Sequence, residues 1–221
     1  LQMALLRRQP QLQMVFSDFR PFLDSHFNAQ ASHCSRYSFF RRRLMPLDER
    51  FHLLPQAHAF EAMMHENYIG SGSIVFSKEA WQRVGGYSTQ LPSAEDLDFS
   101  LRLSEHFEFG YVDEVLHYYR IHAGGKSSNK IRNYNCALSI LRRYQGVKMD
   151  EAARRALREQ VLEFEMDLTC LCSEAGKLDK AVGHWWRALK LGGLRRELLR
   201  PSRKLLQGSA ALLFRRQTRA A

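Results

Sequence analysis

The first part of the chain combines a helix-like apolar pattern with a strand-like one. Leu1–Arg8 has the spacing of an amphipathic helix, with Leu1, Leu5 and Leu6 on one face, and a proline follows its end. Leu12–Phe19 is a short apolar run rich in strand-forming residues, which predicts a buried strand. A helix joined to a strand by a short link is typical of an α/β unit.

Two more strands and a short helix are predicted in the middle of the chain. Ile69–Phe76 runs from a turn of small residues into a strand, and Phe109–Leu116 has the pattern of another strand. Lys78–Val84 lies between them as a short helix, which Gly85 and Gly86 end as C-terminal glycines do. This alternation of strands and helices again favours an α/β layer.

The segment SAEDLDFSLRLSEH predicts a further helix that begins near Ser93. Ser93 is a natural N-cap, and Asp96 stands three residues later, as in a capping box. Leu97 and Leu101 supply the inner face of this helix. Glu95 and Asp96 then lie in its first turn, where the helix dipole stabilises carboxylates.

The pattern changes after about residue 131 and becomes helical. Spacings that alternate between four and three residues predict one helix through Leu157, Val161, Phe164, Leu168, Leu171 and Ala175. A glycine follows, and a second stripe runs through Leu178, Ala181, Val182, Trp185 and Leu189. Two helices joined by a short turn form an αα-hairpin. We therefore predict an α/β domain over residues 1–145 and a small all-α helical module over residues 146–221.

Composition supports a packed protein with a basic tail. The chain has 221 residues, of which 45% are hydrophobic and 25% charged, and this balance excludes a disordered, collagen-like or disulfide-rich miniprotein. The net charge is +10, and residues 192–221 alone hold eight Arg or Lys against one acid. The rest of the chain is close to neutral, so it is not built to bind a polyanion. We interpret Arg41, Arg42 and Arg43 as a solvated patch.

Cysteine and histidine usage gives no sign of a disulfide framework or a zinc site. The four cysteines form no CxxC pair, and the nine histidines have no metal-ligand spacing. We predict that the cysteines are small buried residues in a reducing compartment. No apolar run approaches the roughly 20 residues that span a bilayer. The sequence therefore favours a cytoplasmic protein.

Two groups of residues are candidates for chemistry. Glu95 and Asp96 are adjacent carboxylates at a helix start, although a charged first turn is the simpler interpretation from spacing alone. Arg120 lies between His117 and His122 after a predicted strand. An arginine binds phosphate through a bidentate fork, and a neutral histidine can bind a metal or a phosphate oxygen.

The order of the motifs carries a resemblance to a known family. The segments concerned are VGG followed by Tyr87, EDLD with LRL within Glu95–Leu103, and YRIH with two serines within Tyr119–Ser128. In this order and at these spacings they resemble the second half of a family 2 glycosyltransferase of the GT-A fold. The resemblance covers residues 1 to about 130.

The resemblance implies a transferase that moves a sugar from a nucleotide-diphosphate sugar to an acceptor hydroxyl with inversion. Asp96 stands at the position of the family's general base, and Glu95 beside it would orient the acceptor. His122 stands where the family has a histidine near the diphosphate that ligates the divalent cation in some members. Arg120 has the chemistry to bind the diphosphate. A glycan or lipid-linked acceptor, in bacterial cell-surface polysaccharide synthesis, is implied as well.

The chain departs from the family in one respect. The family holds its divalent cation, Mg²⁺ or Mn²⁺, largely through an aspartate-rich DxD motif, and the early aspartates Asp18, Asp24 and Asp48 are not paired in that way. We therefore expect the chain to begin just after that motif, as a fragment that is inactive alone.

A non-catalytic module that binds a protein or a nucleic acid is the alternative function. The helical part weakly resembles one tetratricopeptide-type repeat, and a single copy is little evidence because such repeats stack. We expect no nucleic acid, because aromatic residues are not interleaved with the basic residues of the tail. The tail could lie on an anionic membrane as a peripheral contact at its inner face, or it could be a solvated basic tail.

Overall fold

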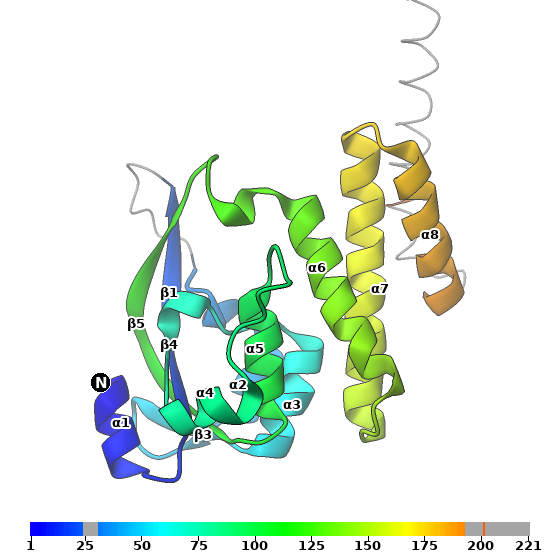
Figure 1. Cartoon of the computed structure of the whole chain (residues 1–221). Helices are drawn as coiled ribbons and strands as arrows, with labels where there is room; N and C mark the ends of the chain where they lie inside the picture. Colours follow the sequence, from blue (N-terminus) through cyan, green and yellow to red (C-terminus); the bar gives the residue numbers. More distant parts are fainter. Residues whose placement is uncertain (24–30, 193–200, 202–221) are drawn as a thin grey trace, which may run out of the picture. The chain divides into compact units, whose positions relative to one another are not determined.

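The computed structural model describes residues 1–23, 31–192 and 201, so nearly all of the basic tail lies outside the described residues. The chain forms two compact units (Figure 1). The sheet unit consists of Leu1–Ser128 and Lys148–Ala156. The helical unit consists of Asn129–Val147 and the described part of Leu157–Ala221. Each unit has buried apolar residues of its own.

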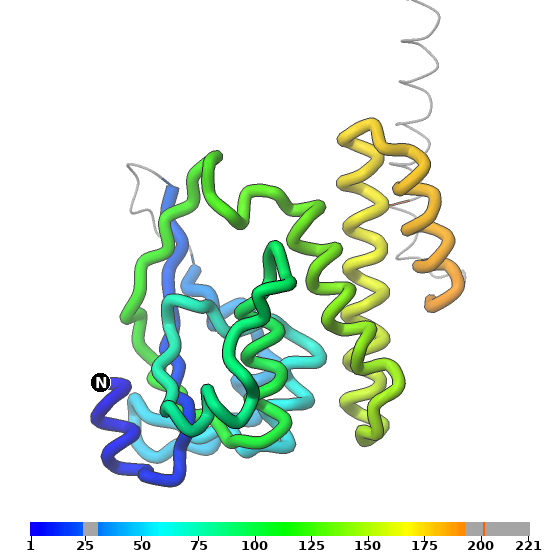
Figure 2. The backbone as a smooth tube through the Cα atoms, in the orientation of Figure 1, coloured from blue at the N-terminus to red at the C-terminus, as the bar shows by residue number. Residues whose placement is uncertain are grey.

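The sheet unit is built on a mixed five-stranded sheet with the order β2-β3-β5-β1-β4. Its central strands β1 (Met14–Leu23) and β5 (Phe109–Ile121) are parallel, and Figure 2 shows them side by side. The strands β3 (Phe51–Leu54) and β4 (Ile74–Phe76) pair antiparallel with β5 and β1, respectively. The edge strand β2 (Met45–Pro46) pairs antiparallel with β3. The expected α/β class is confirmed.

Five α-helices belong to the described part of the sheet unit before residue 128: α1 (Gln2–Arg8), α2 (Ser38–Arg41), α3 (Gln56–His65), α4 (Lys78–Val84) and α5 (Glu95–Ser104). Three short 3₁₀ turns accompany them: η1 (Cys34–Arg36), η2 (Ser71–Ser73) and η3 (Lys126–Ser128). Figure 1 shows α1 on one side of the sheet and α3 and α5 on the other. The predicted helix 78–84 is confirmed residue for residue.

Strand β1 separates two layers of core, because successive side chains of a strand point to opposite faces. Val15 packs with Leu5 of α1 on one face. Phe16 packs on the other face, where its ring centroid lies 4.9 Å from that of Tyr111 and 5.4 Å from that of Tyr68. The predicted burial of this apolar run is confirmed, and it places the following residues of β1 at the functional site.

One arginine joins α5 to the turn that ends α4. Arg102 donates to the Asp98 carboxylate at 2.6 and 3.0 Å and to the Gly86 carbonyl at 2.7 Å. Gly85 and Gly86 have φ values of 78° and 72°, in the left-handed region that favours glycine. The ring of Trp81 occupies the space that a Cβ on Gly86 would need, 2.4 Å away. The glycine pair and the EDLD segment are therefore parts of one structural unit, and Asp98 is a structural residue.

The arginine patch predicted to be solvated is instead mostly held in ion pairs. Arg41 donates to both carboxylate oxygens of Asp113 at 3.1 and 2.9 Å. Arg43 donates to both oxygens of Glu61 at 2.9 and 3.0 Å, and Glu61 is buried. A buried carboxylate needs such a partner, because leaving it unpaired in an apolar environment is costly. Only Arg42 of the three is exposed.

The described part of the helical unit contains helices and no strand, as the apolar stripes predicted. Its elements are α6 (Lys130–Arg143), the turn η4 (Tyr144–Gly146), α7 (Glu151–Glu174), whose first turns belong to the sheet unit, and α8 (Leu178–Gly192). Leu157, Val161 and Leu168 of the first stripe are buried. Val182 of the second stripe is 50% exposed, so its predicted inward position is wrong. Leu1 of the first helix is likewise exposed, because α1 begins only at the following residue.

A buried carboxylate gathers two arginines and a histidine in the helical unit. Glu165 of α7 is fully buried. It accepts from Arg142 of α6, lies 2.6 Å from Nδ1 of His184 of α8, and accepts from Nε of Arg187 at 3.0 Å. These partners hold the pKa of Glu165 below its usual value, although burial alone would raise it. The group links the three helices of this unit.

All four cysteines are free and buried, as predicted. Within the described ranges, no helix has the length and apolar character needed to cross a membrane.

Candidate functional site

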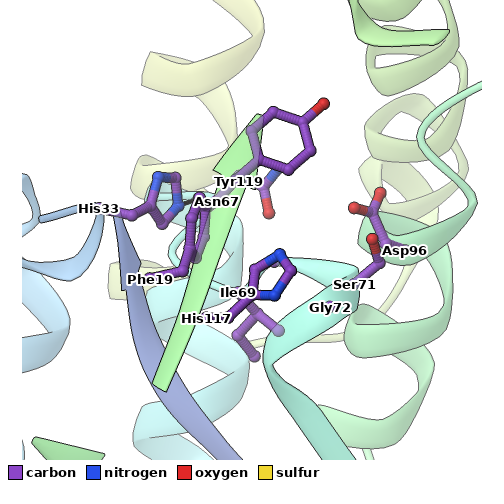
Figure 3. A pocket seen from close by; sticks show the side chains of 10 residues that line it. Phe19, His33, Asn67, Ile69, Ser71, Gly72, Asp96, His117 and Tyr119 are labelled. Atoms are coloured by element: carbon purple, nitrogen blue, oxygen red, sulfur yellow. Dashed lines mark hydrogen bonds between the residues drawn. The ribbon is translucent and has the colours of Figure 1, made fainter. Parts of the chain in front are cut away.

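A pocket of about 160 Å³ lies between the carboxyl-terminal parts of β1 and β5 and the first turn of α5. It is lined by residues of the sheet unit only: Phe19, His33, Asn67, Ile69, Gly70, Ser71, Gly72, Asp96, His117 and Tyr119. Figure 3 shows the Asp96 carboxylate on one side and the rings of the aromatic and histidine residues on the other. The pocket thus sets one carboxylate opposite a wall of rings.

The small residues of the η2 turn let two of these rings approach the backbone. A Cβ on Gly70 would lie 2.5 Å from the ring of Phe19. A Cβ on Gly72 would lie 2.7 Å from Nε2 of His117. The hydroxyl of the buried Ser73 donates to the Gly70 carbonyl at 2.8 Å and fixes the turn. The Gly-Ser-Gly sequence therefore serves close packing of rings against a turn.

Asp96 is placed by a strained helix start. Ala94, just before α5, has φ 60° and ψ 25°, and among the described residues it is the only non-glycine residue with positive φ. Such a conformation costs about 1–3 kcal/mol and is often found at functional sites. The helix begins at Glu95, one residue later than a capping box would need, and its N-cap residue makes no side-chain cap bond. The N-cap position therefore falls on Ala94 and not on Ser93, where the capping-box pattern predicted it.

Burial is the largest influence on the pKa of Asp96. Its Oδ1 accepts from the Leu97 N–H at 2.9 Å, which favours the carboxylate. Burial nevertheless raises the pKa of Asp96, and the charge of Glu95 adds to this, while Lys126 opposes it. The pKa therefore moves against the direction that the helix dipole alone would give, because burial outweighs it. A carboxylate with a raised pKa is a better proton acceptor when ionised.

The aromatic wall is held from the side of β1. The rings of Phe19 and His33 are stacked with centroids 4.2 Å apart, and Nε2 of His33 lies 3.0 Å from the Asn67 carbonyl. Asp18 accepts from the N–H groups of Phe19 and Cys34 at 2.7 and 2.9 Å, and this fixes the chain around His33. Burial lowers the pKa of His33, so this ring favours the neutral form.

One polar atom at the pocket has no hydrogen-bond partner among the described residues. Oδ1 of Asn67 is buried and unpaired, and Asn67 lines the pocket. An unpaired buried carbonyl oxygen carries a desolvation cost of about 1–3 kcal/mol. A bound hydroxyl or N–H group would relieve that cost. The pocket therefore offers an acceptor at Asn67 in addition to the Asp96 carboxylate.

Two bonds connect the η3 turn to α5 and to the pocket residue Tyr119. Lys126 of η3 donates to Glu95 of α5 at 2.5 Å, and the hydroxyl of Tyr119 lies 2.5 Å from that of Ser127. Both bonds are exposed at the surface. Glu95 itself does not line the pocket. Its charge lies beside Asp96 and raises the pKa of that residue.

The structure separates Arg120 and His122 from the pocket. His117 and Tyr119 line the pocket, while Arg120 and His122 are exposed and do not. The two-residue period of a strand explains this, because Arg120 points to the opposite face from Tyr119. The same period, applied to His117 and Tyr119, is the signal in the sequence that could have found these two pocket residues.

The residues present do not form a site for a divalent cation by themselves. Within the described ranges, no three His, Cys, Asp or Glu side chains come together in a way that could hold a metal ion. The pocket residues Phe19, His33 and Asn67 were not predicted from the sequence, because no motif marks them. Comparison of the chain with protein-family models, curated proteins and solved structures gives no match.

Proposed function

We propose that the chain is the acceptor-binding part of an inverting glycosyltransferase that uses a nucleotide-diphosphate sugar. The observation that carries this proposal is the position of Asp96, a half-buried carboxylate with a raised pKa on the wall of a pocket. The order of the VGG, EDLD and YRIH motifs supports the same family resemblance. A mixed sheet with a central parallel pair is compatible with a GT-A fold.

In the proposed reaction, Asp96 removes the proton of an acceptor hydroxyl. The acceptor oxygen forms a new bond to the anomeric carbon of the donor sugar, and the bond from that carbon to the nucleoside diphosphate breaks. The electron pair of the broken bond leaves with the diphosphate. Attack on the face opposite the leaving group inverts the configuration. A general base in such a step typically contributes about 10²–10⁴ in rate.

The other pocket residues suit an acceptor that is itself a sugar. Phe19 offers an apolar ring face, while Asn67 and His117 offer polar groups on the same side. Binding sites of this kind combine an apolar lining with a few orienting polar groups. A cavity of about 160 Å³ has room for one sugar ring rather than for an extended glycan. A glycan or lipid-linked acceptor would therefore enter with its terminal residue.

Glu95 is proposed to position the site through Lys126 rather than by contact with the acceptor. Its carboxylate is engaged by Lys126 at 2.5 Å and lies outside the pocket lining. Arg120 stays a proposed contact to the donor diphosphate and His122 a proposed ligand of its divalent cation; both are exposed near the end of β5, outside the pocket lining. The described residues form no cation site, so no step of the proposal passes through a metal. Cytoplasmic synthesis of a cell-surface polysaccharide is the proposed setting.

The test is Asp96→Asn in a longer protein that joins these residues to a nucleotide-binding half of the proposed family. Transfer should fall at least ~10²-fold, because the amide cannot accept the hydroxyl proton. Donor affinity should be unchanged, since Asp96 is assigned to the acceptor. Kinetics with saturating donor and a binding titration measure the two effects separately.

The control is Glu95→Gln, which changes the neighbouring carboxylate and should lower transfer much less. Thermal unfolding of both variants checks that the fold survives. The amide introduced by Asp96→Asn can still accept from the Leu97 N–H, and no charge has to be buried, so stability should not decrease. Near-wild-type turnover of Asp96→Asn would show that the base assignment is wrong. Absence of donor binding by the wild-type protein would favour the non-catalytic binding module.

A further inference from the structure

Helix α8 carries more apolar surface than the helical unit buries. Ala181, His184 and Ala188 are buried on its inner side. Val182 and Trp186 are one turn apart on another side, and they are 50% and 52% exposed. These two side chains form a small exposed apolar strip on one side of an amphipathic helix.

The exposed apolar strip of α8 is bordered by cations. Nζ of Lys190, one turn beyond Trp186, lies 5.6 Å from the centroid of the indole ring. Lys180 and Arg187 are also exposed on this helix, and Asp179 is its only acidic residue. The sequence that follows, residues 192–221, adds eight Arg or Lys against one Glu. The apolar strip therefore lies in a strongly cationic stretch of the chain.

We propose that the strip formed by Val182, Trp186 and Lys190 docks on an anionic lipid surface. The indole ring is amphipathic and favours the level of the lipid headgroups, where Val182 would enter the acyl boundary beside it. Lys190 and the following basic residues are attracted to anionic headgroups. This inference is independent of the proposed transfer reaction, because it uses no residue of the pocket.

Charge selects a lipid surface over a second copy of the chain. Two copies meeting through α8 would bring together two C-terminal stretches, each with a net charge of +7 over residues 192–221. Their mutual repulsion opposes such a dimer. An anionic membrane turns the same charges into attraction. The chain's own tail, which contains Leu205, Leu206 and Phe214, is the other possible cover and is an outcome of the test.

The test is co-sedimentation of the 221-residue chain with vesicles of phosphatidylcholine alone or mixed with phosphatidylglycerol. Wild-type chain should bind the mixed vesicles and not the neutral ones. Trp186→Ser should lower the partition coefficient at least about fivefold, and Trp186→Phe should keep most of it. Lys190→Gln should lower it about fivefold, with the loss shrinking as salt is raised. Met45→Ser, a similarly exposed apolar site in the sheet unit, is the control and should change nothing.

Three results would overturn the proposal. Unchanged partition of Trp186→Ser would show that any binding comes from the basic tail alone. Increased partition of this variant would show that the tail covers the strip in the free protein. A concentration-dependent dimer of the wild type that Trp186→Ser abolishes, seen by analytical ultracentrifugation, would assign the strip to a second copy.

Discussion

At the scale of single residues, the base proposed for transfer is controlled by two neighbouring charges of opposite sign. Burial is the largest cause of the raised pKa of Asp96; Glu95 raises this pKa further, and Lys126 lowers it. Lys126 and Glu95 are bonded to each other at 2.5 Å, so their effects largely offset each other while the pair is intact. Loss of either charge alone should therefore move the titration of Asp96.

Replacing Lys126 with Met should raise the pKa of Asp96, because the Glu95 charge would then act without its counterion. A general base works only when ionised, so the rate of transfer falls as the pH drops through its pKa. The acidic limb of kcat/KM should therefore move to higher pH in Lys126→Met. Lys78→Met, on the exposed surface of α4, should leave the profile in place. An acidic limb that does not move in Lys126→Met would mean that another group titrates.

The close approach of the Phe19 ring to the η2 turn makes a second residue-scale prediction. Gly70→Ala would place its Cβ 2.5 Å from the Phe19 ring, which is stacked on His33 and has little room to move. We expect a loss of about 1–3 kcal/mol in the free energy of unfolding, as for overpacked cores. Gly124→Ala is the matched control, since its Cβ would meet no atom closer than 3.6 Å. Equal stability of the two variants in urea would contradict this account of the pocket.

At the scale of elements, charged side chains join helices in both units. Arg102 ties α5 to the glycine pair after α4, and Glu165 ties α7 to α6 and α8. In both sites the carboxylate, Asp98 or Glu165, is buried while its arginine partners remain partly exposed. Of the residues in the Glu165 group, we therefore expect loss of the Glu165 carboxylate to lower the free energy of unfolding most.

Glu165→Gln should destabilise the helical unit by about 2–4 kcal/mol. The amide cannot neutralise Arg142 and Arg187, and removal of one member of a buried charged group is costly. The arginines can turn partly toward water, which limits the cost. Glu163→Gln, at an exposed position of the same helix, is the control and should stay within about 0.5 kcal/mol. Urea unfolding followed by circular dichroism measures the change in the free energy of unfolding for both variants. A smaller loss for Glu165→Gln than for Glu163→Gln would show that the buried ionic group does not stabilise the helical unit.

At the scale of the whole molecule, local patterns predicted elements well and long-range contacts poorly. The helix 78–84 and the two C-terminal helices have periodic patterns that burial of one face explains. The pairing of β1 with β5, and the pocket residues His33 and Asn67, depend on segments that meet only in three dimensions. Asp96 was found through its motif, but its raised pKa comes from burial, which spacing does not reveal.

Divalent cations provide a prediction for the chain as a whole. Since no three suitable side chains meet in the described part, Mn²⁺ titrated into the 221-residue chain should show no saturable millimolar or tighter site by calorimetry. In a longer protein that joins these residues to a nucleotide-binding half of the proposed family, chelation of the cation should weaken donor binding, and His122→Ala should do the same. A saturable site in the short chain that His122→Ala removes would place a cation site within these residues.

The parallel pairing of β1 with β5 also sets the order of events during synthesis. Met14 pairs with Phe109, so the central ladder closes only after a long stretch of chain has been made. During synthesis, the apolar face of β1 stays without its β5 partner until β5 has been made. The α7–α8 hairpin, by contrast, forms between segments that are neighbours in the sequence. Long-range pairing is slow compared with local helix contacts, and a waiting strand is prone to aggregate. We therefore expect the risk of aggregation through the unpaired face of β1 to fall once β5 has been synthesised and can pair with it.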